Sequence, residues 1–366
     1  MAYWPALFAI ISYIVTQLSA GRSITILTPE IKCILFITTY ALLLMPLSRD
    51  IGRSWEVFIN ELIKTSLIFI IMANVLFTEA RIKTMMWLGV AIGVYLSYQS
   101  YDLNQRGVFN TLGNRVSVDV GGMFGNPNDM AIHLVIFIPI AIALGLNSHK
   151  RTIKYLCYTV VALMTYAIIL TQSRGGFLGL IAVAVAIIWK FGRGHRIRLM
   201  LISSILAICF IMLAPGEYGT RFRSIFNPSL DSTGSSSERE ELLKRSIIVT
   251  LRNPLGVGLG NSTTFGVRNL VTHNAYTQVS SELGWLSFGA YLIFLIVPLR
   301  FLSKIETEMN ISGENSSIYL LIIGTQIGII GYMVSSFFAS VAYQWYVYYP
   351  IAFAIGFRLV YERSQP

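Results

Sequence analysis

The chain has 366 residues, of which 54% are hydrophobic and only 13% are charged. Soluble domains carry about 25% charged residues, and the mean hydropathy of this chain is +0.63. This composition excludes an ordinary soluble domain, a disordered chain and a small secreted protein held by disulfides. It indicates a polytopic membrane protein.

The formal net charge of +10 has a topological explanation in such a protein. Basic residues fix the orientation of short loops, and arginines also bind anionic ligands. No basic stripe interleaved with stacking aromatics occurs in the sequence, so we expect no nucleic-acid partner. The spacing of Cys33, Cys157 and Cys209 predicts neither a disulfide framework nor metal ligands.

Apolar runs along the whole chain predict an all-α bundle of about 11 (10–12) transmembrane helices in a single integral membrane domain, 1–366. Several runs are shorter than the roughly 20 residues of a full span, which makes their edges uncertain. The alternating pattern of a membrane barrel is missing from the sequence. The runs are 4–20, 33–47, 62–77, 85–99, 130–146, 155–172, 177–189, 199–213, 283–301, 318–338 and 341–357.

Basic residues in the short loops predict the orientation of the bundle. The loop 147–154 carries three basic residues and the loop 190–198 carries four, whereas the turn 171–176 between them carries one. The positive-inside rule therefore places the two basic loops and the C-terminus in the cytoplasm. The N-terminus and the turn 171–176 are then expected outside.

Two external segments, 100–129 and 214–282, are longer than simple connections and are expected to carry function. Within the second, residues 237–253 predict a helix that starts with a capping box of Ser237 and Glu240. One face of this helix is apolar and is expected to lie along the membrane surface. That face consists of Leu242, Leu243, Ile247, Ile248 and Leu251.

Arg174 lies in the external turn between two closely spaced apolar runs. An arginine at the edge of the membrane is costly unless it is paired or hydrated, and on the external side it has no role in topology. We expect it to bind an anionic ligand, because Gly175 and Gly176 would let the ligand approach backbone N–H groups at the start of the next helix. The alternative is a snorkelling arginine that caps a helix end.

Arg245 lies on the predicted loop helix and precedes Gly256, which opens the sequence GVGLG. Successive N–H groups of a glycine-rich turn can bind phosphate. Taken alone, however, this element is interpreted more simply as a solvated arginine followed by a flexible turn.

His273 is the only one of the four histidines in an external loop. An imidazole of ordinary pKa, about 6.5, suits a general base near neutral pH. Asn274 follows it and is expected to contact substrate, and Glu282 would orient the imidazole or balance its charge. The alternatives are a solvent-exposed histidine that caps the next helix and an interfacial carboxylate. In the preceding external segment, Asn128 or Asp129 is expected to cap a helix.

The external side thus offers arginines, glycine turns and one histidine close to lipid. The sequence has no Asp-x-Asp pair, no Cys/His cluster and no H-E-x-x-H motif, so neither a metal nor another cofactor is expected. Arginine binds phosphate through two parallel hydrogen bonds. This chemistry predicts a lipid-linked diphosphate as ligand, with the histidine taking a proton from an attacking hydroxyl.

Three motifs in this order resemble the O-antigen ligase/polymerase superfamily: SRGGFLGL after a span, Arg245-x10-Gly256, and HNAYTQVSSELGWLSFGAYL at 273–292. FGNPNDMA at 124–131 also recurs in that group, and the resemblance covers roughly 120–300. Members of the superfamily have about twelve spans, one more than the runs counted here.

The resemblance implies a GT-C-like glycosyltransferase of the bacterial inner membrane that acts in lipopolysaccharide or exopolysaccharide biosynthesis. The donor would be an undecaprenyl-diphosphate-linked glycan on the periplasmic or outer face, and the acceptor a glycan or a lipid-anchored glycan. A ligase moves the glycan to lipid A–core, and a polymerase extends it by repeat units. The family's diphosphate-binding arginines map onto Arg174 and Arg245, and its proposed base maps onto His273.

A transporter or flippase for an anionic lipid-linked glycan is the alternative function. Transporters hold their substrates near the midplane of the membrane on broken helices. In this chain the predicted spans carry almost no charge, and the polar groups gather on one side. This distribution favours the enzyme.

Overall fold

The computed structural model describes residues 3–21, 23–109, 115–191, 197, 235–266, 271–312 and 318–364. These parts of the chain are helical and contain no β-strand, with one isolated bridge between Val120 and Met123. The all-α expectation is therefore confirmed for them.

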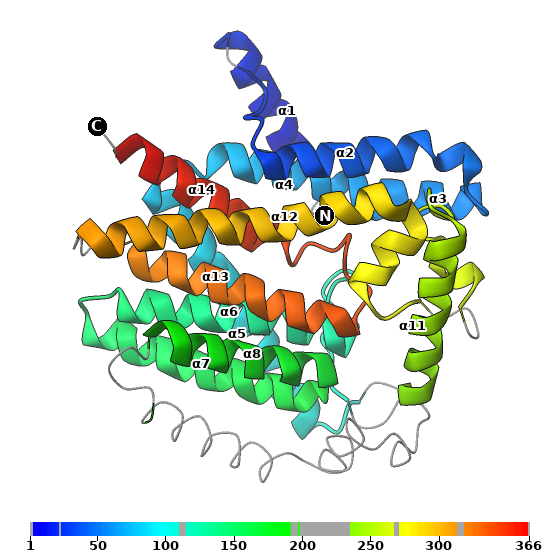
Figure 1. Cartoon of the computed structure of the whole chain (residues 1–366). Coiled ribbons are helices and arrows are strands. Elements are labelled where there is room, and N and C mark those ends of the chain that lie inside the picture. The colour runs from blue at the N-terminus through cyan, green and yellow to red at the C-terminus, as the bar shows by residue number, and fades with distance from the viewer. Residues whose placement is uncertain are drawn as a thin grey trace.

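Helices of very different length make up the fold (Figure 1). The first half contains α1 (Tyr3–Ser19), α2 (Pro29–Leu43), η1 (Met45–Leu47), α3 (Ile51–Val57), the π-helical η2 (Phe58–Leu62), α4 (Ile63–Val75), α5 (Glu79–Gln105), α6 (Pro127–Leu146), α7 (Arg151–Thr171) and α8 (Arg174–Phe191). The second half contains α11 (Ser235–Arg252), η4 (Asn261–Thr264), α12 (Ala275–Ser312), α13 (Tyr319–Ser335), η6 (Ser336–Phe338) and α14 (Tyr348–Ser364).

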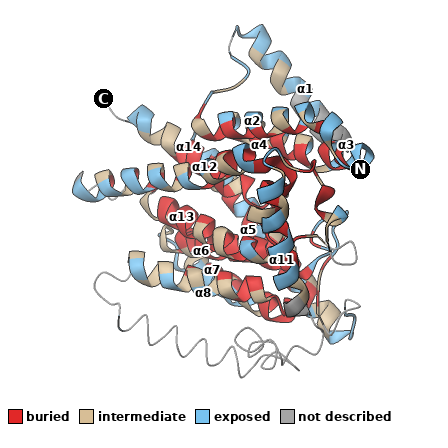
Figure 2. Cartoon of the chain, turned by 45° about the vertical axis from the view of Figure 1, so that its right-hand side comes forward, coloured by how far each residue is buried: buried red, intermediate tan, exposed pale blue. Residues whose placement is uncertain are grey.

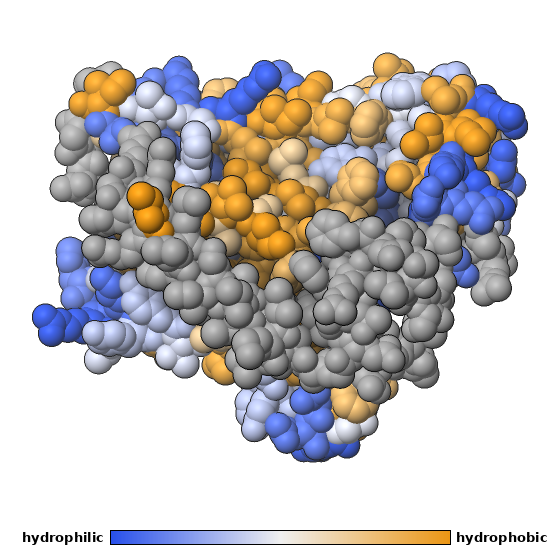
Figure 3. Space-filling view, turned by 60° about the horizontal axis from the view of Figure 1, so that its bottom comes forward, coloured by the Kyte–Doolittle hydropathy of each residue, from blue (hydrophilic) through white to orange (hydrophobic). Residues whose placement is uncertain are grey.

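Every predicted apolar run overlaps one of these helices except 199–213, which lies outside the described residues. Four helical segments of the described part are long and apolar enough to cross a membrane. They are Pro127–Leu146, Arg151–Thr171, Ala275–Ile311 and Tyr319–Phe338. The expected count of about 11 spans is therefore not confirmed. In Figure 3, apolar side chains gather in the middle of one face and hydrophilic ones lie toward its two ends, as in a protein that crosses a bilayer.

The centre of the bundle is the pair of helices α6 and α13, whose residues are mostly buried (Figure 2). α6 also packs against α5, α7 and α8. Gly328 lets the two central helices approach closely, because it has no side chain. A Cβ atom at this position would lie only 2.8 Å from the carbonyl oxygen of Ile136. Small residues in helix contacts are the usual means of close packing in membranes.

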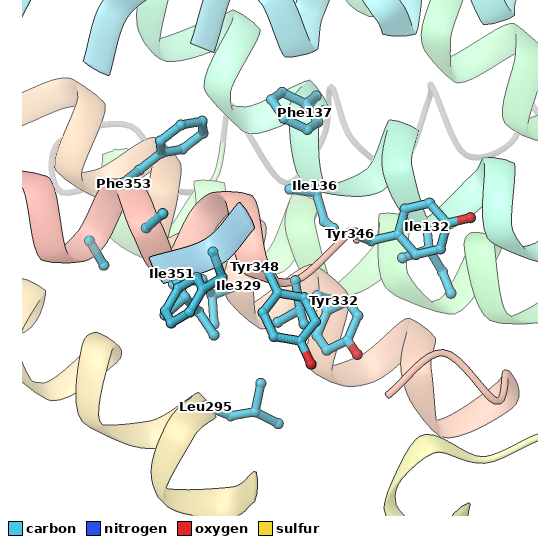
Figure 4. Packing of buried hydrophobic residues seen from close by; sticks show 14 of the residues in the cluster. Ile132, Ile136, Phe137, Leu295, Ile329, Tyr332, Tyr346, Tyr348, Ile351 and Phe353 are labelled. Carbon is cyan, nitrogen blue, oxygen red and sulfur yellow. The ribbon is translucent and has the colours of Figure 1, made fainter. Parts of the chain in front are cut away.

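Side chains of the two central helices and of α12 and α14 belong to one buried apolar cluster (Figure 4). Phe137 of α6, Tyr332 of α13, Phe353 of α14 and Leu295 of α12 are all buried members of this cluster. The aromatic rings of Phe137 and Phe353 meet edge to face, with their centroids 6.5 Å apart. This core fixes the relative positions of the helices whose ends form the candidate site.

The order of the antiparallel helices brings five helix ends together at one end of the bundle (Figure 1). These are the starts of α6, α8 and α12 and the ends of α7 and α13, and α11 lies across them. Lys150, Arg151 and Lys190 lie at the opposite ends of α7 and α8. Which end faces the cytoplasm stays a prediction.

α11 begins at Ser235, so Ser237 lies inside the helix and the predicted N-cap is wrong. Glu240 forms an ion pair with Lys244 one turn later. The apolar residues of α11 divide between two sides. Leu242 is fully buried, whereas Ile247, Ile248 and Leu251 are exposed.

α12 is interrupted at Gly284, where φ is 71° and ψ is −172°. The turn after α11 fits into this break, because the N–H of Trp285 donates to the carbonyl oxygen of Pro254 at 3.0 Å. A Cβ atom at Gly284 would lie 2.2 Å from that same oxygen. The first part of α12 is thereby set at the end of the bundle, beside α11.

Candidate functional site

A pocket of about 220 Å³ lies where α8, α11 and the start of α12 meet. Its polar lining consists of Arg174, Arg239, Glu240, Thr272, His273 and Asn274. The structure thus brings together three of the predicted site residues, Arg174, His273 and Asn274, from segments far apart in the chain. Arg239 and Glu240 were not predicted as site residues.

The rest of the described pocket lining is mainly apolar. It includes Leu178 of α8, Leu243 of α11, and Phe337 and Phe338 of η6. A charged group and a hydrocarbon chain in one ligand would both find matching surfaces here.

Arg174 is held by a sharp reversal between α7 and α8. α7 ends at Thr171, Gln172 adopts left-handed backbone angles with φ 48°, and α8 starts at Arg174. A positive φ is uncommon outside glycine and costs of order 1–3 kcal/mol, so it persists only where the surroundings enforce it. Among the described residues only Phe124, Gln172 and His273 combine a side chain with positive φ, and all three lie at this end of the bundle.

A buried hydrogen-bond network enforces the reversal. The Oδ1 atom of Asn128 accepts from Ser173 Oγ at 2.8 Å and from Arg115 Nη2 at 3.0 Å. Arg115 also donates from Nε to the carbonyl oxygen of Thr171 at 3.0 Å, and the N–H of Gly176 donates to Ser173 Oγ at 3.1 Å. Loop 115–126, the start of α6 and the start of α8 are thus tied into one unit behind Arg174.

Asn128 therefore has a different role from the predicted one. The N-cap of α6 is Asn126, whose side chain accepts from the N–H of Asn128, and Pro127 occupies the first helical position. The expectation that Asn128 or Asp129 caps the helix is wrong by two or three positions. Arg115 could not be recognised as a supporting residue from the sequence, because its partners are 13 and 56 residues away.

The two glycines after Arg174 serve helix packing. A Cβ atom at Gly175 would lie 2.8 Å from the Cβ of Phe338, and one at Gly176 would lie 2.6 Å from the Cβ of Ala131. The N–H of Gly176 already donates a hydrogen bond to Ser173 Oγ. These glycines let the start of α8 pack closely against η6 and α6, so the prediction that they open the backbone to a ligand is not needed to explain them.

Asn274 caps α12 and also faces the pocket. Its Oδ1 atom accepts from the N–H groups of Tyr276 and Thr277 at 2.9 and 3.0 Å. The side chain is only 3% exposed, and its Nδ2 atom has no hydrogen-bond partner among the described residues. A buried amide donor without a partner costs about 1–3 kcal/mol, which an acceptor on a bound ligand would recover.

His273 precedes this cap with φ 52°, in the left-handed region. Burial, together with the smaller effects of the nearby charges of Arg239 and Arg115, lowers the pKa of His273 to about 4. The imidazole is therefore neutral at pH 7 and able to accept a proton.

Arg245 lies on α11 but is not among the described lining residues of the pocket. Its guanidinium forms an ion pair with Glu241, and both side chains are about half-exposed. Its Nη1 atom also reaches the carbonyl oxygen of Phe265 at 3.5 Å. In this conformation the guanidinium of Arg245 is held by Glu241 and by the carbonyl oxygen of Phe265, outside the described pocket lining.

Gly256 and Glu282 form a second unit, which connects the turn after α11 to α12. The carboxylate of Glu282 is 1% exposed and accepts from the N–H of Gly260 at 3.0 Å and from that of Ser262 at 3.3 Å. The N–H of Gly256 donates to Asn253, and that of Gly258 donates to the carbonyl oxygen of Glu282. The glycine-rich turn therefore uses its N–H groups within the protein, and neither Gly256 nor Glu282 lines the pocket.

No group of three or more His, Cys, Asp or Glu side chains within the described ranges is arranged to hold a metal ion. The charged groups of the pocket lining are two arginines, Arg174 and Arg239, and one carboxylate, Glu240, which is paired with Lys244.

The comparison with protein families gives one match. The family model described as O-antigen ligase matches residues 159–292. This match confirms the resemblance to the O-antigen ligase/polymerase superfamily, and the matched segment contains all six predicted site residues, listed here in chain order: Arg174, Arg245, Gly256, His273, Asn274 and Glu282. The comparison with curated proteins gives no significant match.

Proposed function

We propose that this protein transfers an undecaprenyl-diphosphate-linked oligosaccharide or polysaccharide to a hydroxyl acceptor at the outer side of the bacterial inner membrane. The observation that carries the proposal is the pocket in which Arg174, His273 and Asn274 meet beside an apolar wall. The match of residues 159–292 to the O-antigen ligase family supports the reaction class.

In the proposed reaction, the hydroxyl oxygen of the acceptor attacks the anomeric carbon of the donor sugar. The bond between that carbon and the phosphate oxygen breaks, and undecaprenyl diphosphate leaves with the electron pair. Arg174 and the free Nδ2 donor of Asn274 stabilise the negative charge that develops on the leaving phosphate. His273 takes the proton of the hydroxyl.

Binding of the donor would also strengthen His273 as a base. In the empty pocket, the charges of Arg239 and Arg115 disfavour a protonated imidazole. A diphosphate carries opposite charge and would offset these arginines, so the pKa of His273 would rise when the donor binds.

Gly256 and Glu282 are proposed as positioning residues, since they connect the α11 turn to the start of α12. The role that the resemblance gives to Arg245 stays a prediction. Its guanidinium would have to leave Glu241 to reach a ligand in the pocket.

The proposal is tested with the full chain in lipid vesicles, a labelled lipid-linked donor and a glycan acceptor. We expect a new glycosidic bond and released polyprenyl diphosphate, also in the presence of a chelator. Removing a general base lowers the rate by roughly 10²–10⁴-fold, and we expect a loss of this order for His273→Ala and a comparable one for Arg174→Ala.

Matched controls lie at the opposite end of the same helices. His149→Ala and Arg151→Ala change exposed residues between α6 and the first turn of α7, and both should keep full activity. Full activity of the Arg174 and His273 variants would refute the site. Passage of the labelled donor across the bilayer without a new bond would refute the enzymatic function.

A further inference from the structure

α11 carries two arginines that point to different sides of the helix. Arg239 and Arg245 are six residues apart, which at 3.6 residues per turn separates them by about 120° around the axis. Arg239 lines the pocket together with Leu243, one turn further along. Arg245 instead pairs with Glu241 on an exposed side.

Arg239 faces the other cationic groups of the site. Among the charges that act on His273, that of Arg239 has the largest effect, ahead of Arg115. Arg174 lines the same pocket from α8. The acidic member of the described lining, Glu240, is already paired with Lys244. Positive groups from two separate helices therefore converge on a small volume, an arrangement that an anion between them stabilises.

We propose that Arg239, on α11, is a second arginine that binds the diphosphate of a prenyl diphosphate, together with Arg174 on α8. This inference rests on the proposed function and adds a residue that neither the motifs nor the family match singles out. A diphosphate has two phosphate groups, and the planar guanidinium of an arginine suits each of them.

Two further observations point to the same class of ligand. The buried Nδ2 atom of Asn274 has no partner among the described residues and lies in the lining of this pocket. The same pocket also has an apolar lining, which consists of Leu178, Leu243, Phe337 and Phe338. An isoprenoid chain attached to the diphosphate would lie against these side chains.

The experiment measures binding of farnesyl diphosphate to the full chain purified in detergent micelles, and of inorganic pyrophosphate as a probe of the charged part alone. Arg239→Ala should weaken binding of both by roughly ten- to hundredfold, the usual range for a lost charged hydrogen bond. Arg239→Lys keeps the charge without the planar fork and should show a smaller loss. Arg252→Ala removes an exposed arginine in the last turn of the same helix and should leave binding unchanged.

Arg174→Ala and Arg245→Ala complete the series. We expect Arg239→Ala to weaken binding more than Arg245→Ala does. The inference is overturned if Arg239→Ala binds as wild type while Arg174→Ala does not, or if Arg245→Ala shows the larger loss. If Arg174→Ala and Arg239→Ala both bind as wild type, the pocket does not hold the diphosphate and the proposed function fails as well. Unchanged thermal unfolding of the variants separates lost binding from misfolding.

Discussion

Glu282 provides a sharp test of how the site is built, because the sequence predicts that it orients the imidazole of His273 and the structure shows its carboxylate bonded to Gly260 and Ser262. Its carboxylate accepts from the N–H groups of Gly260 and Ser262 and is almost fully buried. Replacing Glu282 with Ala leaves both donors without a partner. A buried donor that loses its acceptor costs about 1–3 kcal/mol, so two cost about 2–6 kcal/mol before any cavity is counted.

Glu282→Gln keeps one carbonyl oxygen and should lower the free energy of unfolding by only about 1–3 kcal/mol. Glu241→Gln, which breaks an exposed ion pair on α11, should lower it by about 0–1 kcal/mol. The assay is reversible unfolding of the purified chain in detergent with increasing dodecyl sulfate, followed by circular dichroism. The KM for donor is measured on the folded fraction.

The predicted pattern is a large loss of stability for Glu282→Ala and a nearly unchanged KM for the Glu282→Gln protein that remains folded. A Glu282→Ala variant as stable as wild type, with a strongly raised KM, would show that the carboxylate binds substrate and that its buried hydrogen bonds are not needed for the fold.

Three further predictions follow from the geometry. The pKa of about 4 for His273 predicts that kcat/KM stays level from pH 7 down to pH 5 and falls only as the pH approaches 4, because protonation removes the base. A fall of kcat/KM centred near pH 6.5 would contradict the burial of the imidazole. Gly176→Ala places a Cβ atom 2.6 Å from Ala131 and should cost about 1–3 kcal/mol in the same unfolding assay, and an unchanged midpoint would show that the helices can separate freely. A spin label on Leu251→Cys should collide more with oxygen than with a water-soluble nickel reagent, since the exposed apolar side of α11 is expected to lie in the membrane surface. A label on Glu241→Cys should show the reverse preference. Equal collision rates for the two labels would place α11 in water.

Hydrophobic runs predicted the helices of this fold well, because length and hydropathy report directly on helices in an apolar environment. The boundaries were less accurate where polar residues extend a helix beyond its apolar part. α12 starts at Ala275 and continues to Ser312, although its apolar run covers 283–301. The interruption at Gly284 depends on Pro254, thirty residues earlier, and no local pattern indicates it.

For the site, residue chemistry identified Arg174, His273 and Asn274, which share one pocket. The spacing Arg245-x10-Gly256 indicated Arg245 as the arginine of α11 that binds the ligand. The arginine of α11 that lines the pocket is Arg239. The two cannot be separated by composition, since both are arginines on one helix, and only the packing of Leu242 and Ser246 against the bundle decides which side of α11 faces inward.

Supporting residues were the hardest to predict. The link from Arg115 through Asn128 to Ser173 joins three segments that are distant in sequence. Each of these residues has a simpler local interpretation, as a loop cation, a helix cap or a turn residue. The network becomes visible only when α6, α7 and α8 are packed together.

The most direct test of the account is a structure of the full chain with a prenyl diphosphate bound, determined by electron cryomicroscopy in lipid nanodiscs. The account predicts that the diphosphate lies between Arg174 and Asn274, within reach of His273, and that the isoprenoid chain extends past Phe337 and Leu243. Density for the diphosphate at the end of the bundle that carries Lys150 and Lys190 would contradict it, as would density for it near the middle of the bundle.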